Sequence, residues 1–218
     1  FGALEWDAQA SWTSAAGWAI PTTPPRMGAG VATINADYIS RLNSTEVNYR
    51  QAPNDRVALL AGFRWVELHE ELGVDADFGG NMSDIGWNVD NHLYGAQTGA
   101  EVMLLDRGGP MQLTSHFKGG IFGNAADNDF GLNQSVGPDV SFTDQTSKVT
   151  FMGDIAFLGR YRINDNVSLN SGYQLLWFDG VALASEQIFA TNVLTGSGID
   201  ADGFVFYHGA LISMDVIW

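Results

Sequence analysis

The sequence predicts an all-β fold: an antiparallel transmembrane up-and-down β-barrel of at least eight strands, with short periplasmic turns and long extracellular loops. Three observations predict it: the alternating faces of the last stretch of the chain, the lack of an apolar run long enough for a spanning helix, and connections that alternate between short and long. All-β barrels of this length commonly form one domain, so we expect residues 1–218 to be a single domain.

The last stretch, residues 204–218, alternates between an apolar face and a small or polar face. Its even positions run from Phe204 to Trp218 and are almost wholly apolar or aromatic, whereas its odd positions include Ser213 and Asp215. A strand with lipid on one side and a polar lumen on the other shows this alternation. We expect Trp218 at the periplasmic rim of the barrel.

Composition narrows the class of protein. No run of 18 apolar residues exists, which excludes a spanning helix, while a barrel strand needs only about 9–11 alternating residues. The net charge of -15 argues against nucleic acid as a partner. The chain has no cysteine, so disulfides and thiolate metal sites are absent. No basic and then apolar leader begins the chain, which is compatible with export followed by cleavage.

Eight alternating stretches are the expected strands. Most place apolar residues on one face and polar residues on the other, but Leu60, Val66 and Leu68 make one of them apolar on both sides. The expected strands are residues 2–12, 28–50, 56–68, 88–104, 111–123, 146–162, 167–177 and 204–218.

The connections alternate in length. We expect short turns at 52–55, 105–110 and 163–166, and long loops at 13–27, 73–87, 124–145 and 179–203. Membrane barrels have short periplasmic turns and long extracellular loops, and with Trp218 at the periplasmic end each connection falls on its expected side. A secreted soluble barrel or sandwich is the alternative, and dependence on detergent distinguishes the two.

Large aromatic side chains recur on the faces expected to contact lipid. Such rings collect at both interfaces of a bilayer because they are amphipathic. The expected membrane-interface residues are Trp6, Trp12, Trp65, Tyr94, Trp177, Phe206 and Trp218.

Charged side chains of both signs fall on the opposite faces, which predicts a polar lumen. In a barrel of eight strands these residues would pair and fill the interior, whereas in a wider barrel they would line a pore and set its ion preference. The expected pore-lining residues are Glu46, Arg50, Arg64, Glu101, Lys118, Lys148, Asp154, Arg160, Arg162 and Asp215.

The sequence predicts no enzyme, cofactor or catalytic residue. The four histidines lie on separate expected strands, and no nucleophile and base share a face at a useful spacing. Three acidic pairs, at 75 and 77, 127 and 129, and 200 and 202, carry the oxygen ligands that calcium prefers. They lack the EF-hand pattern, so solvated acidic loops remain the alternative and we assign no metal site.

Five segments resemble the beta-barrel porin family found mainly in planctomycetes: residues 38–50, 60–68, 91–99, 172–184 and 207–210. The resemblance covers about residues 38–218 and implies a barrel in the bacterial outer membrane. Two features depart from the family. Members usually carry further strands ahead of the segment similar to residues 1–12, so this chain is either a shortened or an incomplete member, and Ser213 stands where glycine is common.

Two functions follow as expectations. The first is a porin-like outer-membrane barrel that allows passive diffusion of small polar solutes. The alternative is a structural barrel that anchors or forms a cell-surface assembly. The expected partners are outer-membrane lipid and, through the extracellular loops, a second copy or other envelope proteins. Eight strands would favour the structural role and twelve or more a pore.

Overall fold

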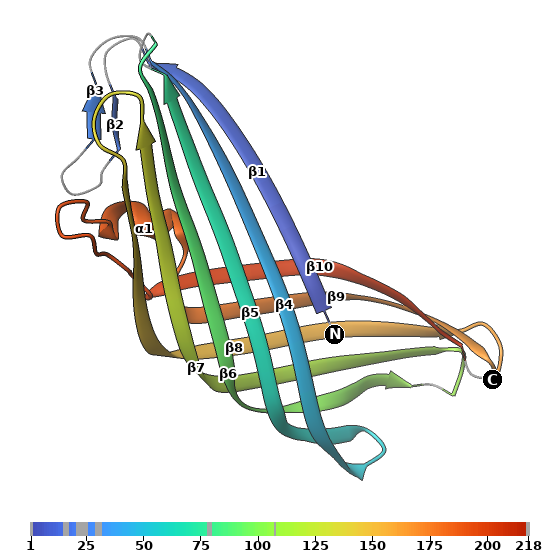
Figure 1. The fold of residues 1–218 in the computed structure, drawn as a ribbon. Coiled ribbons are helices and arrows are strands. Elements are labelled where there is room, and N and C mark those ends of the chain that lie inside the picture. The colour runs from blue at the N-terminus through green and yellow to red at the C-terminus, as the bar shows by residue number, and fades with distance from the viewer. Residues whose placement is uncertain are drawn as a thin grey trace.

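A computed structural model of the chain is built almost entirely of long β-strands (Figure 1). It describes the backbone of residues 2–14, 18–20, 26–28, 32–77, 80–106 and 108–216. Side chains are described for residue 9 and for residues 33–77, 80–106 and 108–216. The elements are β1 (Gly2–Ser14), β2 (Trp18–Ile20), β3 (Arg26–Gly28), β4 (Ala32–Asn54), β5 (Val57–Asp77), β6 (Met82–Asp106), β7 (Met111–Gln134), β8 (Val140–Arg162), β9 (Val167–Val181), α1 (Ala184–Ala190) and β10 (Gly203–Val216).

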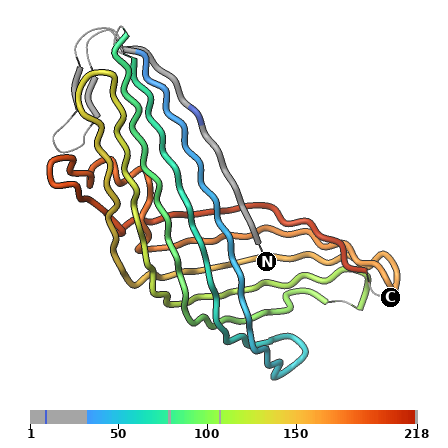
Figure 2. The backbone as a smooth tube through the Cα atoms, viewed as in Figure 1, coloured from blue at the N-terminus to red at the C-terminus, as the bar shows by residue number. Residues whose placement is uncertain are grey.

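The strands form one large curled sheet in the order β1-β4-β5-β6-β7-β8-β9-β10, and β2 and β3 form a separate hairpin. Every neighbouring pair is antiparallel. The described residues contain no pairing between β1 and β10, so the sheet curls as a half-barrel, as the backbone trace in Figure 2 shows. The predicted all-β, antiparallel, up-and-down architecture is confirmed. Closure of the barrel and passage through a membrane stay predictions.

The three short turns lie at one end of the sheet, the end at which β10 finishes (Figure 1). Asparagine side chains close two of them. The Asn54 Oδ1 accepts hydrogen bonds from the backbone N–H groups of Arg56 and Val57, both at 2.9 Å. The Asn164 Oδ1 does the same for Asn166 and Val167 at 2.9 and 2.8 Å. Such side-chain bonds to the backbone mimic a turn, which explains the tight reversals. We call this the turn end.

Two of the predicted long loops are wrong. Residues 73–87 and 124–145 are mostly strand, and the connections that replace them are the short segments 78–81 and 135–139. Acidic residues suggested loops, but the alternation continues through them: Val74 and Ala76 on β5, and Ile85, Trp87 and Val89 on β6, are buried on the inner face. Period-two alternation with a buried apolar face is enough to form a strand, and acids on the exposed face do not prevent it.

The strands divide into two parts along their length. We call residues 45–65, 94–123, 149–181 and 203–216 the belt region, because their outward face is apolar and exposed. It carries the following exposed side chains: Val47, Leu59, Phe63, Trp65, Tyr94, Phe117, Ile121, Val149, Phe151, Phe157, Tyr173, Phe204, Phe206 and Ile212. The described residues of 32–44, 66–93, 124–148 and 182–202 form the extension.

The extension reverses the polarity of the two faces. Its inner face is apolar, and the buried side chains of Val74, Ile85, Trp87, Phe130 and Leu132 belong to one core cluster with Ala182, Ala184 and Ala201. Segment 182–202, which includes α1, lies beside the long strands where β9 and β10 have no counterpart (Figure 1). It therefore gives the apolar inner face of the extension a partner.

Charge is distributed as unevenly as polarity. Among the described residues, the belt region holds eight acids and six Lys or Arg, whereas the extension holds fifteen acids and only Arg41 and Lys148 as cations. Most of the net negative charge of the described chain therefore lies on the extension. The acids of the extension are Asp37, Glu67, Glu70, Glu71, Asp75, Asp77, Asp84, Asp90, Asp127, Asp129, Asp139, Asp144, Glu186, Asp200 and Asp202.

Candidate functional site in the barrel interior

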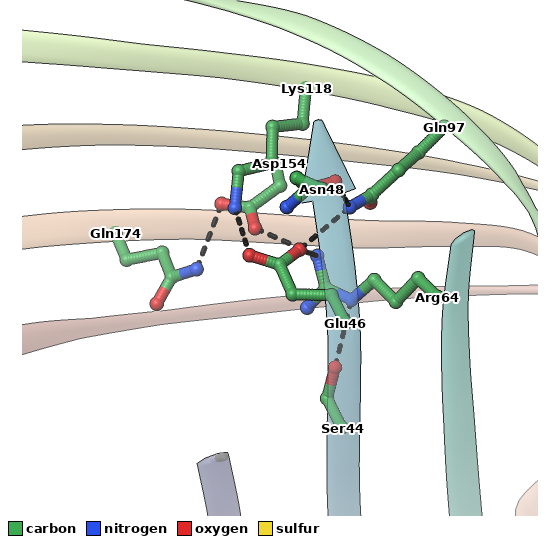
Figure 3. Close-up of polar contacts among 8 residues, drawn as sticks. All are labelled: Ser44, Glu46, Asn48, Arg64, Gln97, Lys118, Asp154 and Gln174. Carbon is green, nitrogen blue, oxygen red and sulfur yellow. Dashed lines mark hydrogen bonds and ion pairs between the residues drawn. The ribbon is translucent and has the colours of Figure 1, made fainter. Parts of the chain in front are cut away.

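Four charged side chains meet inside the belt region, carried by four different strands (Figure 3). Arg64 on β5 is almost fully buried, and its Nη1 lies 3.0 Å from the Oδ2 of Asp154 on β8 and 3.7 Å from the Oε2 of Glu46 on β4. The Nζ of Lys118 on β7 lies 2.5 Å from the other carboxylate oxygen of Glu46. Two cations and two anions thus form a neutral cluster, which we call the central network.

Neutral side chains complete the central network. The Arg64 Nε donates to the Ser44 hydroxyl at 2.8 Å. The Gln97 Nε2 donates to Glu46 at 2.7 Å and to the Asn48 Oδ1 at 2.8 Å, and the Gln174 Nε2 donates to Asp154 at 2.8 Å. Buried charges are stable only when they are paired and hydrogen-bonded, and each carboxylate here meets both conditions.

The pairs of the central network cross the interior. In the strand register, Glu46 is directly opposite Arg64, and Lys118 is directly opposite Asp154. The closest contacts instead join Lys118 on β7 to Glu46 on β4, and Arg64 on β5 to Asp154 on β8. Side chains from facing walls therefore meet in the middle, as expected where a barrel is narrow enough for its interior to be filled by side chains.

An apolar cluster lies next to the central network on the side of the extension. It includes Leu42, Val66, Leu93, Phe122, Met152, Leu176 and Phe178, all buried. Tyr207 on β10 and Ser40 on β4, on facing walls, also meet here, with their hydroxyl oxygens 3.2 Å apart. The central network and the apolar cluster therefore cover the inner face of the sheet between the turn end and the extension.

Segment 182–202 is fixed to the inner wall of the extension by hydrogen bonds. Asn91 donates to the Ala182 carbonyl and accepts from the Ala182 N–H, both at 2.8 Å. The buried Glu70 accepts from the Ala184 N–H at 2.9 Å, and the Trp87 indole donates to the Thr191 hydroxyl at 2.8 Å. These bonds satisfy polar groups that burial would otherwise leave without partners, so the segment is a fixed part of the fold.

A polar vestibule of about 840 Å³ lies at the turn end, on the other side of the central network. Two ion pairs line it: Arg50 with Glu101 at 2.8 Å and Arg160 with Asp215 at 2.9 Å. Asn170 donates to the same carboxylate oxygen of Asp215 at 3.0 Å. All four charged side chains are partly exposed, so the vestibule is a hydrated space that carries both signs of charge.

The ten residues predicted to line a pore comprise two groups of four and two residues that lie apart from them. Glu46, Arg64, Lys118 and Asp154 form the central network, and Arg50, Glu101, Arg160 and Asp215 line the vestibule. Lys148 lies elsewhere, in the extension, where it pairs with Asp202. Arg162 is exposed at the turn end, where its backbone N–H donates to the Pro110 carbonyl.

The sequence analysis missed the neutral members of the central network, Ser44, Asn48, Gln97 and Gln174. They share strand parity with the charged residues, and that signal could have found them. It also missed Glu70 and its contacts with segment 182–202. Glu70 lies just after the expected strand 56–68, and nothing in the sequence around this acidic residue indicates that it is buried.

The predicted membrane-interface residues are described in part. Trp65, Tyr94 and Phe206 are exposed on the outer face. Trp177 is half-buried because its indole ring covers Gly153, where no side chain would fit. The side chains of Trp6, Trp12 and Trp218 lie outside the described residues.

Other candidate features carry no site. Within the described ranges, no group of three His, Asp or Glu side chains is arranged to hold a metal ion. Of the acidic pairs considered for calcium, those at 75 and 77 and at 127 and 129 lie on strands β5 and β7. No helix in the described part of the chain is long and apolar enough to cross a membrane.

Comparison with protein-family models, with curated proteins and with solved structures found no match for this chain.

Proposed function

We propose that the protein is an outer-membrane β-barrel with an obstructed interior, which acts as a structural unit carrying its extension on the cell surface. The observation that carries this proposal is the reversal of polarity along the strands. The belt region is apolar outside and charged inside, and the extension is acidic outside and apolar inside. Lipid around the first part and water around the second would account for both patterns.

The size of the belt region fits a bilayer. It includes residues 57–65 of β5 and 94–104 of β6, close to the length of about 9–11 residues that a tilted spanning strand needs. The outward aromatic rings of Trp65 and Tyr94 occupy directly opposed positions at its boundary with the extension, where an interfacial girdle would lie. The rest of β6, residues 82–93, would project about 40 Å along the strand.

The interior favours the structural role over a pore. A solute that entered the vestibule would meet the central network and then the apolar cluster. Passage would require separating the buried Arg64 and Asp154 and displacing packed side chains such as Phe122 and Phe178. The bonds between segment 182–202 and the wall oppose this rearrangement. The resemblance of several segments to an outer-membrane porin family supports the location more than it supports diffusion.

Porin-like diffusion of small polar solutes is the second candidate. The vestibule favours it, because its volume and mixed charge suit a hydrated entrance. In that case the arginines of the vestibule would bias the pore toward anions, although the acidic extension would oppose this at the other mouth.

Single-channel recording in planar bilayers separates the two candidates. We expect no steady conductance from purified protein whose insertion is verified by protease protection. A steady conductance whose reversal potential shifts in the variant Arg50→Gln with Arg160→Gln would overturn the structural proposal in favour of the pore. As a control, Arg162→Gln should leave the recordings unchanged, because Arg162 is exposed at the turn end and does not line the vestibule.

A further inference from the structure

The extension leaves one edge of β8 without a strand partner. On one side, β8 pairs with β7 from Val140 to Tyr161. On the other side, its described pairing with β9 begins only at Phe151, opposite Asp179. Residues 141–149 are therefore an edge strand within the described fold.

The register shows which backbone groups point to this edge. The Arg162 N–H donates to the Pro110 carbonyl on the β7 side, and the β7–β8 register has no shift from there to Val140. Backbone groups alternate in direction along a strand, so even residues of β8 bond to β7 and odd residues face the other way. The N–H and C=O groups of residues 141, 143, 145 and 147 therefore point to the free edge, whereas the Val149 carbonyl at the end of the stretch lies beside Gly180 of β9.

This edge lacks most of the features that usually prevent another strand from pairing with an edge strand. Natural edges carry proline, bulges or charged side chains that hinder pairing with another strand. Residues 141–149 contain no proline and no bulge. Of the two charged side chains, Lys148 pairs with Asp202. Asp144 accepts from the N–H groups of Gly198 and Gln145, so it engages only one of the N–H groups of this edge.

The surroundings of the edge are acidic. Thr143 is opposite Asp129 on β7, and Asp202 is largely exposed at one end of the free stretch. The whole described extension holds fifteen acids against two Lys or Arg residues. A strand added here would therefore gain from positive charge.

We propose that the free edge of β8, residues 141–149, binds an extended basic peptide segment of another envelope protein by strand addition. Backbone hydrogen bonds would supply affinity, and the acidic surroundings would select a lysine- or arginine-rich strand. This function adds a binding activity to the extension and is independent of whether the interior conducts.

Fluorescence anisotropy tests this binding. The probes are a labelled synthetic peptide of alternating valine and lysine and a control peptide with glutamate in place of lysine. The protein is held in phosphatidylcholine nanodiscs, which carry no net charge. The basic peptide should bind and the acidic one should not, and binding should weaken as salt is raised.

Two variants at one position test the edge itself. Ser147→Pro removes an N–H that points to the free edge and leaves the β7–β8 bonds intact, so it should weaken binding about tenfold. Ser147→Thr keeps the N–H and should bind like the unaltered protein. Equal binding by the two variants, or no binding of the basic peptide to the unaltered protein, would overturn the proposal.

Sedimentation of the peptide-free protein gives the remaining outcome. We expect no self-association that depends on residue 147. A dimer that Ser147→Pro abolishes would show that a second copy occupies the edge, which would also overturn the proposal. Because binding is measured separately from lipid contact, its failure would leave the bilayer placement of the belt region untouched.

Discussion

Asp154→Asn tests the central network most sharply. The change removes the charge that faces Arg64 at 3.0 Å and keeps the size of the side chain. The two side chains are only 7% and 6% exposed, so water cannot replace the lost partner. Breaking a buried pair in this way costs about 3–5 kcal/mol. Glu46, at 3.7 Å from Arg64, offsets part of the loss, so we expect the free energy of unfolding to decrease by about 3 kcal/mol.

The assay is urea unfolding of the protein in phospholipid vesicles, followed by tryptophan fluorescence. Asp215→Asn is the matched control, because its partner Arg160 lies at a similar 2.9 Å but both side chains are about half exposed. It should cost less than about 1 kcal/mol. The double variant Arg64→Met with Asp154→Leu should recover most of the stability, because no unpaired charge remains. Equal costs for Asp154→Asn and Asp215→Asn would refute the buried network.

Two further changes test packing and charge. Gly153→Val should lower the free energy of unfolding by about 1–3 kcal/mol, because an added Cβ would lie 1.9 Å from the Trp177 ring. Gly119→Ala is the control, because a Cβ added there would lie 3.8 Å from its nearest atom. Equal effects of the two changes on stability would contradict the contact between Gly153 and Trp177. Burial, with Asp200, Glu70 and Asp202 nearby, raises the pKa of Glu186 in α1. The folded protein therefore binds the proton of the Glu186 carboxyl group more tightly than the unfolded chain does. Once the pH exceeds the pKa of Glu186 in the unfolded chain, the charged carboxylate lowers the free energy of unfolding. Glu186→Gln should stabilise the protein at neutral pH, with the gain vanishing as the pH falls below that value; a gain that persisted in acid would contradict this.

Most of what could be predicted from the sequence rests on strand parity, which is the alternation of side chains between the two faces of a strand. It separates Arg64 from Phe63 and Trp65, and the structure has the arginine inside and the two rings outside. Parity does not reveal which facing side chains meet, because that depends on how tightly the sheet curls. The contact between Arg64 and Asp154, 90 residues apart in the chain, could not be read from local pattern.

The extension was missed for a physical reason. Acidic residues such as Asp75 and Asp84 lie directly opposite each other on neighbouring strands, which local propensity disfavours. Burial of Val74 and Ile85 on the other face outweighs that repulsion. The buried core around segment 182–202 could not be foreseen either, because it joins residues far apart in the sequence.

Spin-label accessibility tests the placement of the belt region in a bilayer most directly. The chain has no cysteine, so single labels can be attached at Ile121→Cys in the belt region and at Val136→Cys in the turn between β7 and β8. The two native side chains are similarly exposed, at 60% and 69%, so burial does not distinguish them. In lipid vesicles, the label at 121 should be relaxed by oxygen and shielded from a water-soluble nickel complex, and the label at 136 should show the reverse. Equal access of the nickel complex to both labels would contradict the bilayer placement.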